Sequence, residues 1–260
     1  MTDLHSPMIL HHHSPIHVVV PLRPGADLDL VRAKLSGAFA QHDHPVVWHI
    51  PRERGDIVQL ADHAAEAARD NAGLLVAAGG DGTINAVAQA AHATGCAMGV
   101  IPRGTFNYFA RTHGIATEVG AAMAQLLAAR PEPVQVAAVN EHLFLVNASV
   151  GLYPDLLEDR EVWKNRFGRS QWVAIWAALA TLLRAQKRLK LKIELEGGQR
   201  EVHTLTLFVG NNRLQLEQVG VVDDQRPDGA RDNGRVTAVV LKPIGTLALL
   251  RLMLRGAMGT

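Results

Sequence analysis

The stretch from residue 73 to residue 92 constrains the fold most strongly, because an apolar strand, a glycine turn and a helix follow one another directly. The apolar run 73–78 leads into Gly-Gly-Asp-Gly-Thr-Ile-Asn at 79–85, and helical spacing continues from Ile84 to His92. Glycines let the backbone approach a ligand closely, and the start of a helix offers N–H groups and a positive dipole end. The stretch predicts an anion-binding turn; the alternative is a plain turn between strand and helix.

Strand and helix patterns alternate through the first half of the chain. Strand-like runs occur at 16–20, 46–50, 73–78 and 97–101. Helical spacing lies between them at 28–39, 57–69 and 84–92. This alternation predicts a doubly wound, mainly parallel α/β domain, which we place at residues 1–132.

The pattern changes after the prolines at 131 and 133. Strand-like runs then occur at 134–139, 143–150, 189–196, 201–210 and 235–241, with helices predicted at 171–185 and 244–254. Gly197 and Gly198 separate two of the runs as a hairpin turn would. We therefore predict a mainly antiparallel β-sandwich domain at residues 133–260, and an α/β plus β fold overall.

A second polar loop follows the strand at 97–101. Its sequence is Pro-Arg-Gly-Thr-Phe-Asn-Tyr-Phe-Ala-Arg, residues 102–111. Because the carboxyl ends of parallel strands meet at one edge of a sheet, we expect this loop and the glycine turn to face the same ligand. Arg23 and Arg103 are candidate cations for neutralising a phosphate there.

Together the two motifs resemble the catalytic domain of the diacylglycerol kinase family, the bacterial soluble lipid kinases related to sphingosine and ceramide kinases. GGDGT alone is also similar to NAD kinases and phosphofructokinases, whereas the second motif points to lipid kinases. The resemblance implies an ATP-binding α/β domain joined to a β-sandwich of the NAD kinase and diacylglycerol kinase type. It also implies Mg²⁺-dependent transfer of the γ-phosphoryl group of ATP to a lipid hydroxyl, such as that of diacylglycerol.

The resemblance also assigns residues. Asp81 is the expected catalytic residue, and a Mg²⁺ loop is expected at Asp232 and Asn233. The expected nucleotide contacts all come from the two motifs: Gly79, Gly80, Asp81, Gly82, Thr83, Ile84, Asn85, Gly104, Thr105 and Asn107.

The sequence departs from the family pattern in several places. Ala86 stands where the family has Glu, Tyr108 stands where it has Asp, and no Asp-Gly-Glu motif occurs in the chain. We therefore expect the β-rich domain to be incomplete at its C-terminus. Two alternatives stay open: a nucleotide- or lipid-binding relative without turnover, and a NAD kinase-like enzyme.

Charge and hydropathy limit the partners. The 26 Lys and Arg against 25 Asp and Glu give no basic excess for nucleic acid, and the apolar run 173–183 is shorter than the ~20 residues of a membrane span. The single cysteine is consistent with a cytoplasmic protein. Trp172 and Trp176 precede a basic cluster, which suggests peripheral contact with the anionic inner membrane; the alternative is a core-facing helix with a solvated basic end. An uncovered strand edge in the shortened sandwich would favour a homodimer.

Overall fold

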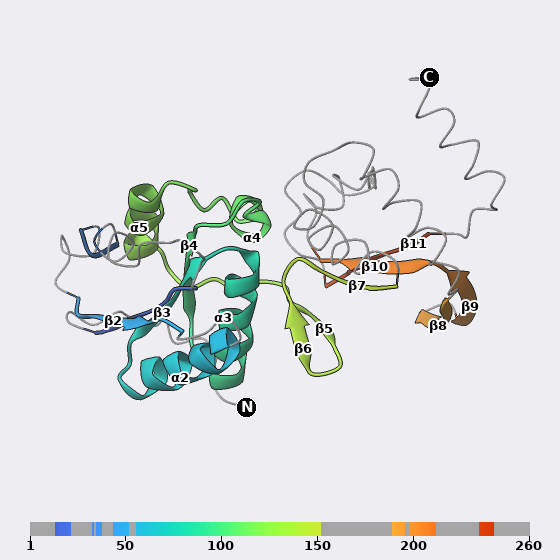
Figure 1. Cartoon of the computed structure of the whole chain (residues 1–260), viewed down its shortest axis with the longest axis horizontal. Helices are drawn as coiled ribbons and strands as arrows, with labels where there is room; N and C mark the ends of the chain where they lie inside the picture. Colours follow the sequence, from blue (N-terminus) through green and yellow to red (C-terminus); the bar gives the residue numbers. More distant parts are fainter. Residues whose placement is uncertain are drawn as a thin grey trace, which may run out of the picture. The chain divides into compact units, whose positions relative to one another are not determined.

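The computed structural model describes residues 14–21, 33, 35–37, 44–51, 56–151, 189–195, 198–211 and 234–241. These fall into two compact units, and the first part of the chain belongs to one unit as far as Val146 (Figure 1). The first unit therefore continues beyond residue 132, the predicted end of the first domain. The helices predicted at 171–185 and 244–254, and most of the one at 28–39, lie outside the described residues.

The first unit contains a sheet of four parallel strands. They are β1 (Ile16–Val19), β2 (Val46–His49), β3 (Leu74–Gly79) and β4 (Met98–Pro102), in the order β2-β1-β3-β4. The chain passes outward from β1 to β2 on one side, and from β3 to β4 on the other. In such sheets, ligands bind beyond the carboxyl ends of the strands where the direction changes, here between β1 and β3.

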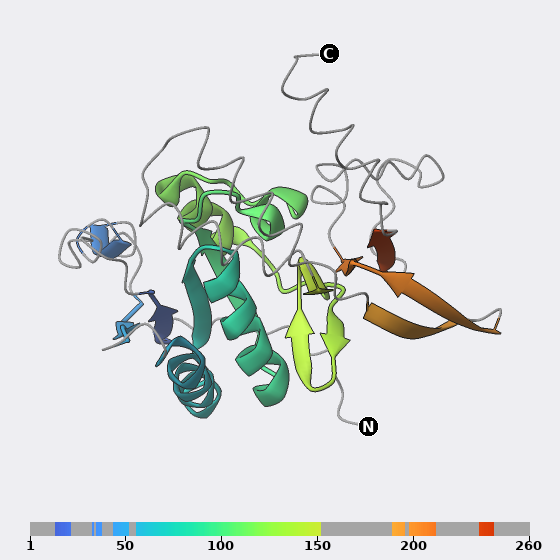
Figure 2. The ribbon, with the colours of Figure 1, turned by 45° about the vertical axis from the view of Figure 1, so that its right-hand side comes forward.

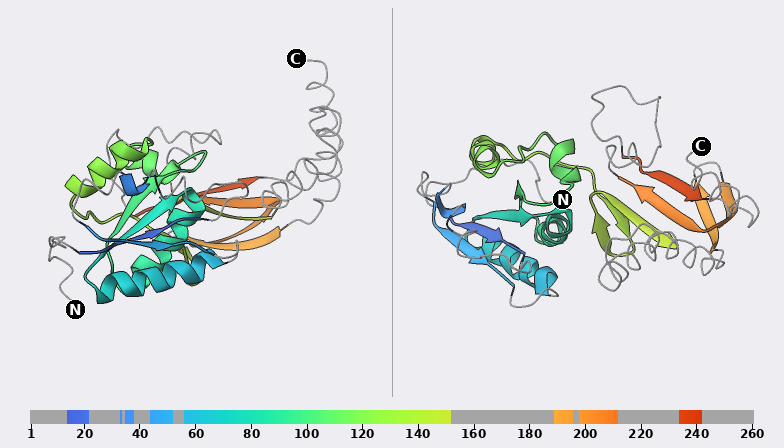
Figure 3. Two further views of the ribbon diagram at one scale, coloured as in Figure 1. Left: turned by 60° about the vertical axis from the view of Figure 1, so that its left-hand side comes forward. Right: turned by 45° about the horizontal axis from the view of Figure 1, so that its top comes forward.

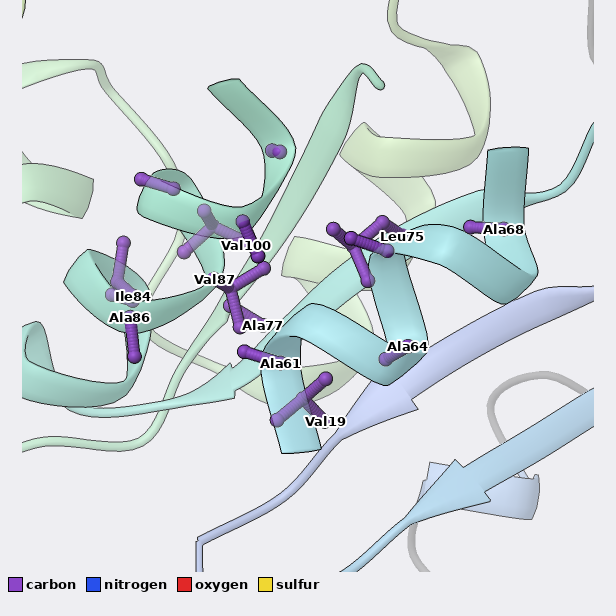
Figure 4. Close-up of a cluster of buried hydrophobic side chains, with 14 of the residues drawn as sticks. Val19, Ala61, Ala64, Ala68, Leu75, Ala77, Ile84, Ala86, Val87 and Val100 are labelled. Carbon is purple, nitrogen blue, oxygen red and sulfur yellow. The ribbon is translucent and has the colours of Figure 1, made fainter. Parts of the chain in front are cut away.

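Helices cover both faces of this sheet. They are α2 (Ile57–Asp70), α3 (Asp81–Thr94), α4 (Tyr108–Thr112) and α5 (Val119–Ala128). Leu75 and Ala77 of β3 pack with α2 and α3, as Figure 4 shows. Their neighbours Val76 and Ala78 pack on the opposite face, in the cluster that contains Met123 of α5. This period of two is the reason that β3 is apolar throughout, and it confirms the predicted doubly wound sheet.

Small side chains allow the helices to lie close to the sheet. The buried residues of α2 are all alanines, namely Ala61, Ala64, Ala65 and Ala68. On the other face, Gly99 of β4 lies directly beneath Leu126 of α5, where a Cβ atom would overlap the leucine. The alanine-rich composition of the first half is therefore a packing requirement of this layer structure.

A hairpin also belongs to the first unit. It consists of β5 (Ala137–Val139) and β6 (His142–Phe144), and Asn140 in its turn has a φ of 55°. The hairpin lies beside α3 (Figure 2). This contact explains why the first unit extends past residue 132.

The second unit is antiparallel, as predicted. One sheet has the order β11-β10-β7, formed by β7 (Asn147–Gly151), β10 (Thr206–Gly210) and β11 (Thr237–Leu241), which lie side by side in Figure 3. A separate pair is formed by β8 (Leu189–Leu195) and β9 (Gly198–Thr204). Across the described part of the chain, no helix is long and apolar enough to cross a membrane.

Two predicted strands are each divided in the structure. The run 201–210 forms β9 and β10, because the buried Thr204 hydroxyl donates to the carbonyl of Thr206 at 2.6 Å and turns the chain there. The run 143–150 forms β6 and β7, and Leu145 between them donates its N–H to the Asn85 side chain at 3.0 Å. In both places a hydrogen bond to a side chain replaces a backbone hydrogen bond between strands, so the strand is interrupted.

A histidine pair lies within the parallel sheet. His17 Nδ1 and His49 Nε2 are 3.0 Å apart, and His17 is only 2% exposed. The Nε2 atom of His17 has no hydrogen-bond partner among the described residues. Burial lowers the pKa of His49 from 6.5 to about 4, assisted by the charges of His17 and His63, and burial also lowers the pKa of His17.

This pair predicts that acid destabilises the first unit. Because the pKa values are lowered in the folded state, the contribution of the two neutral histidines to the unfolding free energy is fully present above pH 6.5. That contribution is lost as the pH falls toward 4. Because the His49 ring is partly exposed, we expect the unfolding free energy to be roughly 1–2 kcal/mol lower at pH 4.5 than at pH 8. Urea unfolding at the two pH values measures this difference. His49→Phe should reduce this dependence, whereas the exposed control His142→Asn should keep it. Equal dependence in all three proteins would contradict the assignment.

Candidate functional site

The two predicted loops begin side by side at the carboxyl edge of the parallel sheet. Gly79 at the end of β3 pairs with Pro102 at the end of β4, and the Arg103 N–H donates to the Gly79 carbonyl at 2.8 Å. Each loop therefore leaves the sheet at the same level. The expectation that they share an edge is confirmed.

The glycine turn ends directly in helix α3. Gly80 is the extended N-cap residue, and the first helical hydrogen bond runs from the Ile84 N–H to the Gly80 carbonyl at 3.0 Å. The N–H groups of Asp81, Gly82 and Thr83 precede this bond, so they point out of the helix at its positive end. Gly82 is exposed, and a Cβ atom built on it would meet nothing within 4 Å. This helix start has the donors and the open space that a phosphate needs.

Close contacts between the loops and within the glycine turn explain two of the glycines. A Cβ atom on Gly104 would lie 2.8 Å from the Cα atom of Gly80, and a Cβ atom on Gly79 would lie 2.6 Å from Thr83 Cβ. Both contacts involve backbone or a buried side chain that cannot move aside. Side chains at positions 79 and 104 would therefore push the turn away from β4 or from its own helix.

Asn107 fixes the shape of the second loop. Its φ is 50°, it is 7% exposed, and it is the N-cap residue of α4. Its Oδ1 accepts the Gly104 N–H at 2.7 Å, and its Nδ2 donates to the Gly104 carbonyl at 3.2 Å. The loop is thus closed by its own asparagine, while Thr105 at its tip is exposed.

Asp81 connects the two loops. Its Oδ1 accepts the N–H of Phe109 in the first turn of α4 at 3.2 Å. The side chain is half-buried, and its second oxygen has no hydrogen-bond partner in the described ranges. The carboxylate therefore supports α4 with one of its two oxygens.

Three other residues of the predicted nucleotide site turn their side chains toward the protein. Ile84 is fully buried in the core. Thr83 is 8% exposed, and its side chain lies against Gly79. Asn85 donates to the Leu143 carbonyl and accepts the Leu145 N–H, both at 3.0 Å. The Asn85 side chain thus holds the hairpin, and the nucleotide contact predicted for it stays a prediction.

Gln89 is a residue that the sequence interpretation missed. It donates to the Glu141 carbonyl at 3.2 Å and accepts the Leu143 N–H at 2.6 Å. Asn85 and Gln89 are four residues apart in an otherwise alanine-rich helix. That spacing of amides on one helix face was the available signal for a polar contact.

The predicted Mg²⁺ loop cannot be placed. Asp232 and Asn233 lie outside the described residues, as does Arg23. Within residues 14–21, 33, 35–37, 44–51, 56–151, 189–195, 198–211 and 234–241, no three His, Cys, Asp or Glu side chains gather as a metal site would require.

Comparison with known proteins gives a consistent result. The family model described as "Diacylglycerol kinase catalytic domain" matches residues 26–139. A Pseudomonas putida protein named "Probable lipid kinase YegS-like" is 30% identical over 220 residues, which cover 82% of this chain and 69% of that protein. A Cronobacter sakazakii protein of the same name is 32% identical over 130 residues, or 48% of this chain and 42% of that protein. In the latter alignment the chain spans less than half of its relative.

A solved structure shows the same fold. The crystal structure of a diacylglycerol kinase from Bacillus anthracis superposes on 93% of this chain and 77% of that chain, with a TM-score of 0.58 and 23% identity. This agreement covers both the parallel sheet and the antiparallel strands. The predicted α/β plus β fold is therefore confirmed.

The loop geometry predicts that replacing Asn107 lowers the stability of the protein. Asn107→Ala removes both hydrogen bonds to Gly104 and leaves alanine in the left-handed conformation, so we expect about 2 kcal/mol less unfolding free energy. Asn107→Gly loses the same bonds without the conformational cost and should lose less. Urea unfolding measures both, with the exposed Asn71→Ala as the matched control. Equal stability of Asn107→Ala and the control would refute this account.

Proposed function

The chain belongs to the diacylglycerol kinase family, and on that premise we propose that it is a lipid kinase. The proposed reaction transfers the γ-phosphoryl group of ATP, with Mg²⁺, to the hydroxyl group of a lipid such as diacylglycerol. The observation that carries the proposal is the contact between Gly104 and Gly80, which brings the second loop against the start of α3. The acceptor, and the activity of this chain by itself, belong to the proposal.

The residues fit the phosphates of a nucleotide. The N–H groups of Asp81, Gly82 and Thr83 would donate to phosphate oxygens, and the absence of a side chain at Gly82 leaves room for them. ATP, when bound, supplies the phosphoryl group and the charge that Mg²⁺ balances. In phosphoryl transfer of this kind, the protein contributes mainly positioning and charge stabilisation.

Asp81 has the position for a second task. Its second carboxylate oxygen lies at the start of the same helix, where it would hold a cation or accept the proton of the lipid hydroxyl. Arg103 follows β4 directly and is half-buried at the same edge, so its guanidinium would offset phosphate charge. Asp232 and Asn233 would hold the structural Mg²⁺ that the family resemblance implies.

The lipid acceptor implies where the protein works. A substrate with acyl chains is presented at a membrane surface, so we propose a cytoplasmic protein that contacts the inner membrane peripherally. A homodimer is the proposed assembly. Both parts of the proposal rest on the chemistry of the substrate and on the sequence pattern.

One alternative has a specific observation in its favour. Asp81 already supports α4, and Tyr108 and Ala86 replace the two acidic residues of the family pattern. A site with fewer carboxylates would still bind a nucleotide while transferring phosphate slowly or not at all. This favours a binding protein without turnover as the second candidate.

The test measures transfer of labelled phosphate from ATP, with Mg²⁺, to micellar diacylglycerol, monoacylglycerol, phosphatidylglycerol and sphingosine. We expect product with one of these lipids and a decrease of at least about 100-fold in Asp81→Asn, because the amide removes the charge. Asp81→Asn keeps an oxygen for the Phe109 N–H, so it separates the charge from the support of α4. Asp70→Asn, on the exposed last residue of α2, is the matched control.

Three other outcomes contradict the proposal. Calorimetric binding of ATP without product on any lipid would indicate the binding protein. Phosphorylation of NAD in place of lipid would indicate a NAD kinase-like enzyme. Full activity of Asp81→Asn would remove Asp81 from the proposed chemistry.

A further inference from the structure

An exposed aromatic pair stands in the second loop. The rings of Phe106 and Tyr108 have centroids 5.4 Å apart and planes only 8° from parallel, and Phe106 is 58% exposed. A single exposed phenylalanine is ordinary on a protein surface. A parallel stack with one ring largely exposed to solvent is different, because an exposed flat ring is a surface on which another ring can stack.

The surrounding contacts hold this pair in place. Asn107 lies between the two aromatic residues in sequence, is 7% exposed and is bonded at both ends of its amide to Gly104. On the other side, the Phe109 N–H is bound by Asp81. The rings are therefore carried by a backbone that is fixed before any ligand binds.

The pair is also close to the proposed phosphate site within the same unit. Gly104, two residues before Phe106, lies against Gly80 at the start of α3. A ligand at this edge with both phosphates and a flat aromatic group would meet N–H donors at one end and the ring at the other. A nucleotide has this combination of groups.

We propose that Phe106, supported by Tyr108, stacks on the base of the nucleotide whose phosphates bind at the start of α3. This rests on the proposed function, and it assigns base recognition to residues outside the glycine turn. Tyr108 stands where the family pattern has an aspartate, so this chain gains an aromatic support where a charge is absent. Because stacking uses the face of a base, we expect purine nucleotides to bind better than pyrimidine nucleotides.

The experiment compares two ligands that share phosphates but not a base. ATP and inorganic tripolyphosphate are titrated by calorimetry into the full chain and into Phe106→Ala. Base stacking predicts that Phe106→Ala weakens ATP binding by about fivefold or more and leaves tripolyphosphate binding unchanged. Phe106→Trp should restore ATP binding. Val139→Ala, which shortens an apolar residue that is 47% exposed on β5, is the matched control.

Each remaining outcome overturns the inference for a different reason. Unchanged ATP affinity in Phe106→Ala would show that the ring does not contact the base. Equal weakening of both ligands would show that the ring only maintains the loop. Failure of both ligands to bind the unchanged protein would overturn the phosphate site itself, and with it the proposed function. Loss of binding to anionic vesicles by Phe106→Ala, with unchanged ATP affinity, would assign the ring to the membrane.

Discussion

The pairing of Gly79 with Pro102 at the end of the β3–β4 ladder is the constraint on which the site depends. It ends two strands at the same level, so the loops that follow must share the space above them. They can do so only because Gly104 has no side chain where it lies against the Gly80 Cα atom. A shift of the register by one residue would exchange the faces of β4 and separate the loops. Three features of the site depend on this one contact: the loop closed by Asn107, the hydrogen bond from α4 to Asp81, and the exposed pair of aromatic rings.

The first half of the fold was predictable because its signals are local. Strands buried on both faces are apolar throughout, and alanine-rich helices separate them, so the α/β alternation is visible in short windows. Helix α4 was not predicted, because it has five residues and begins at a left-handed Asn107. Its support from Asp81 comes from 28 residues earlier in the chain. The divided strands at Leu145 and Thr204 were missed for the same reason, since side-chain hydrogen bonds end them.

The candidate site was predictable in position but only partly in the roles of its residues. The sequence indicated which two loops meet, since parallel strands fix that edge. It could not show which way each side chain of α3 faces. Asn85 belongs to the glycine motif and has the chemistry of a ligand contact, yet its amide is bonded to Leu143 of the hairpin and to Leu145 directly after it. Phe106 lies inside the second motif, and only its exposure and its parallel stack with Tyr108 distinguish it.

The position of Asp81 has a consequence for charge. Its carboxylate lies in the first turn of α3 and accepts an N–H from the first turn of α4. The negative charge therefore offsets part of the positive potential at this edge of the sheet. A bound phosphate would have to share that potential with a fixed negative charge only a few ångströms away, which is unfavourable unless a cation lies between them. In the proposed reaction, the same carboxylate that orders the second loop would make phosphate binding depend on a counter-charge. Arg103 and a divalent cation on the second oxygen of Asp81 would supply that charge.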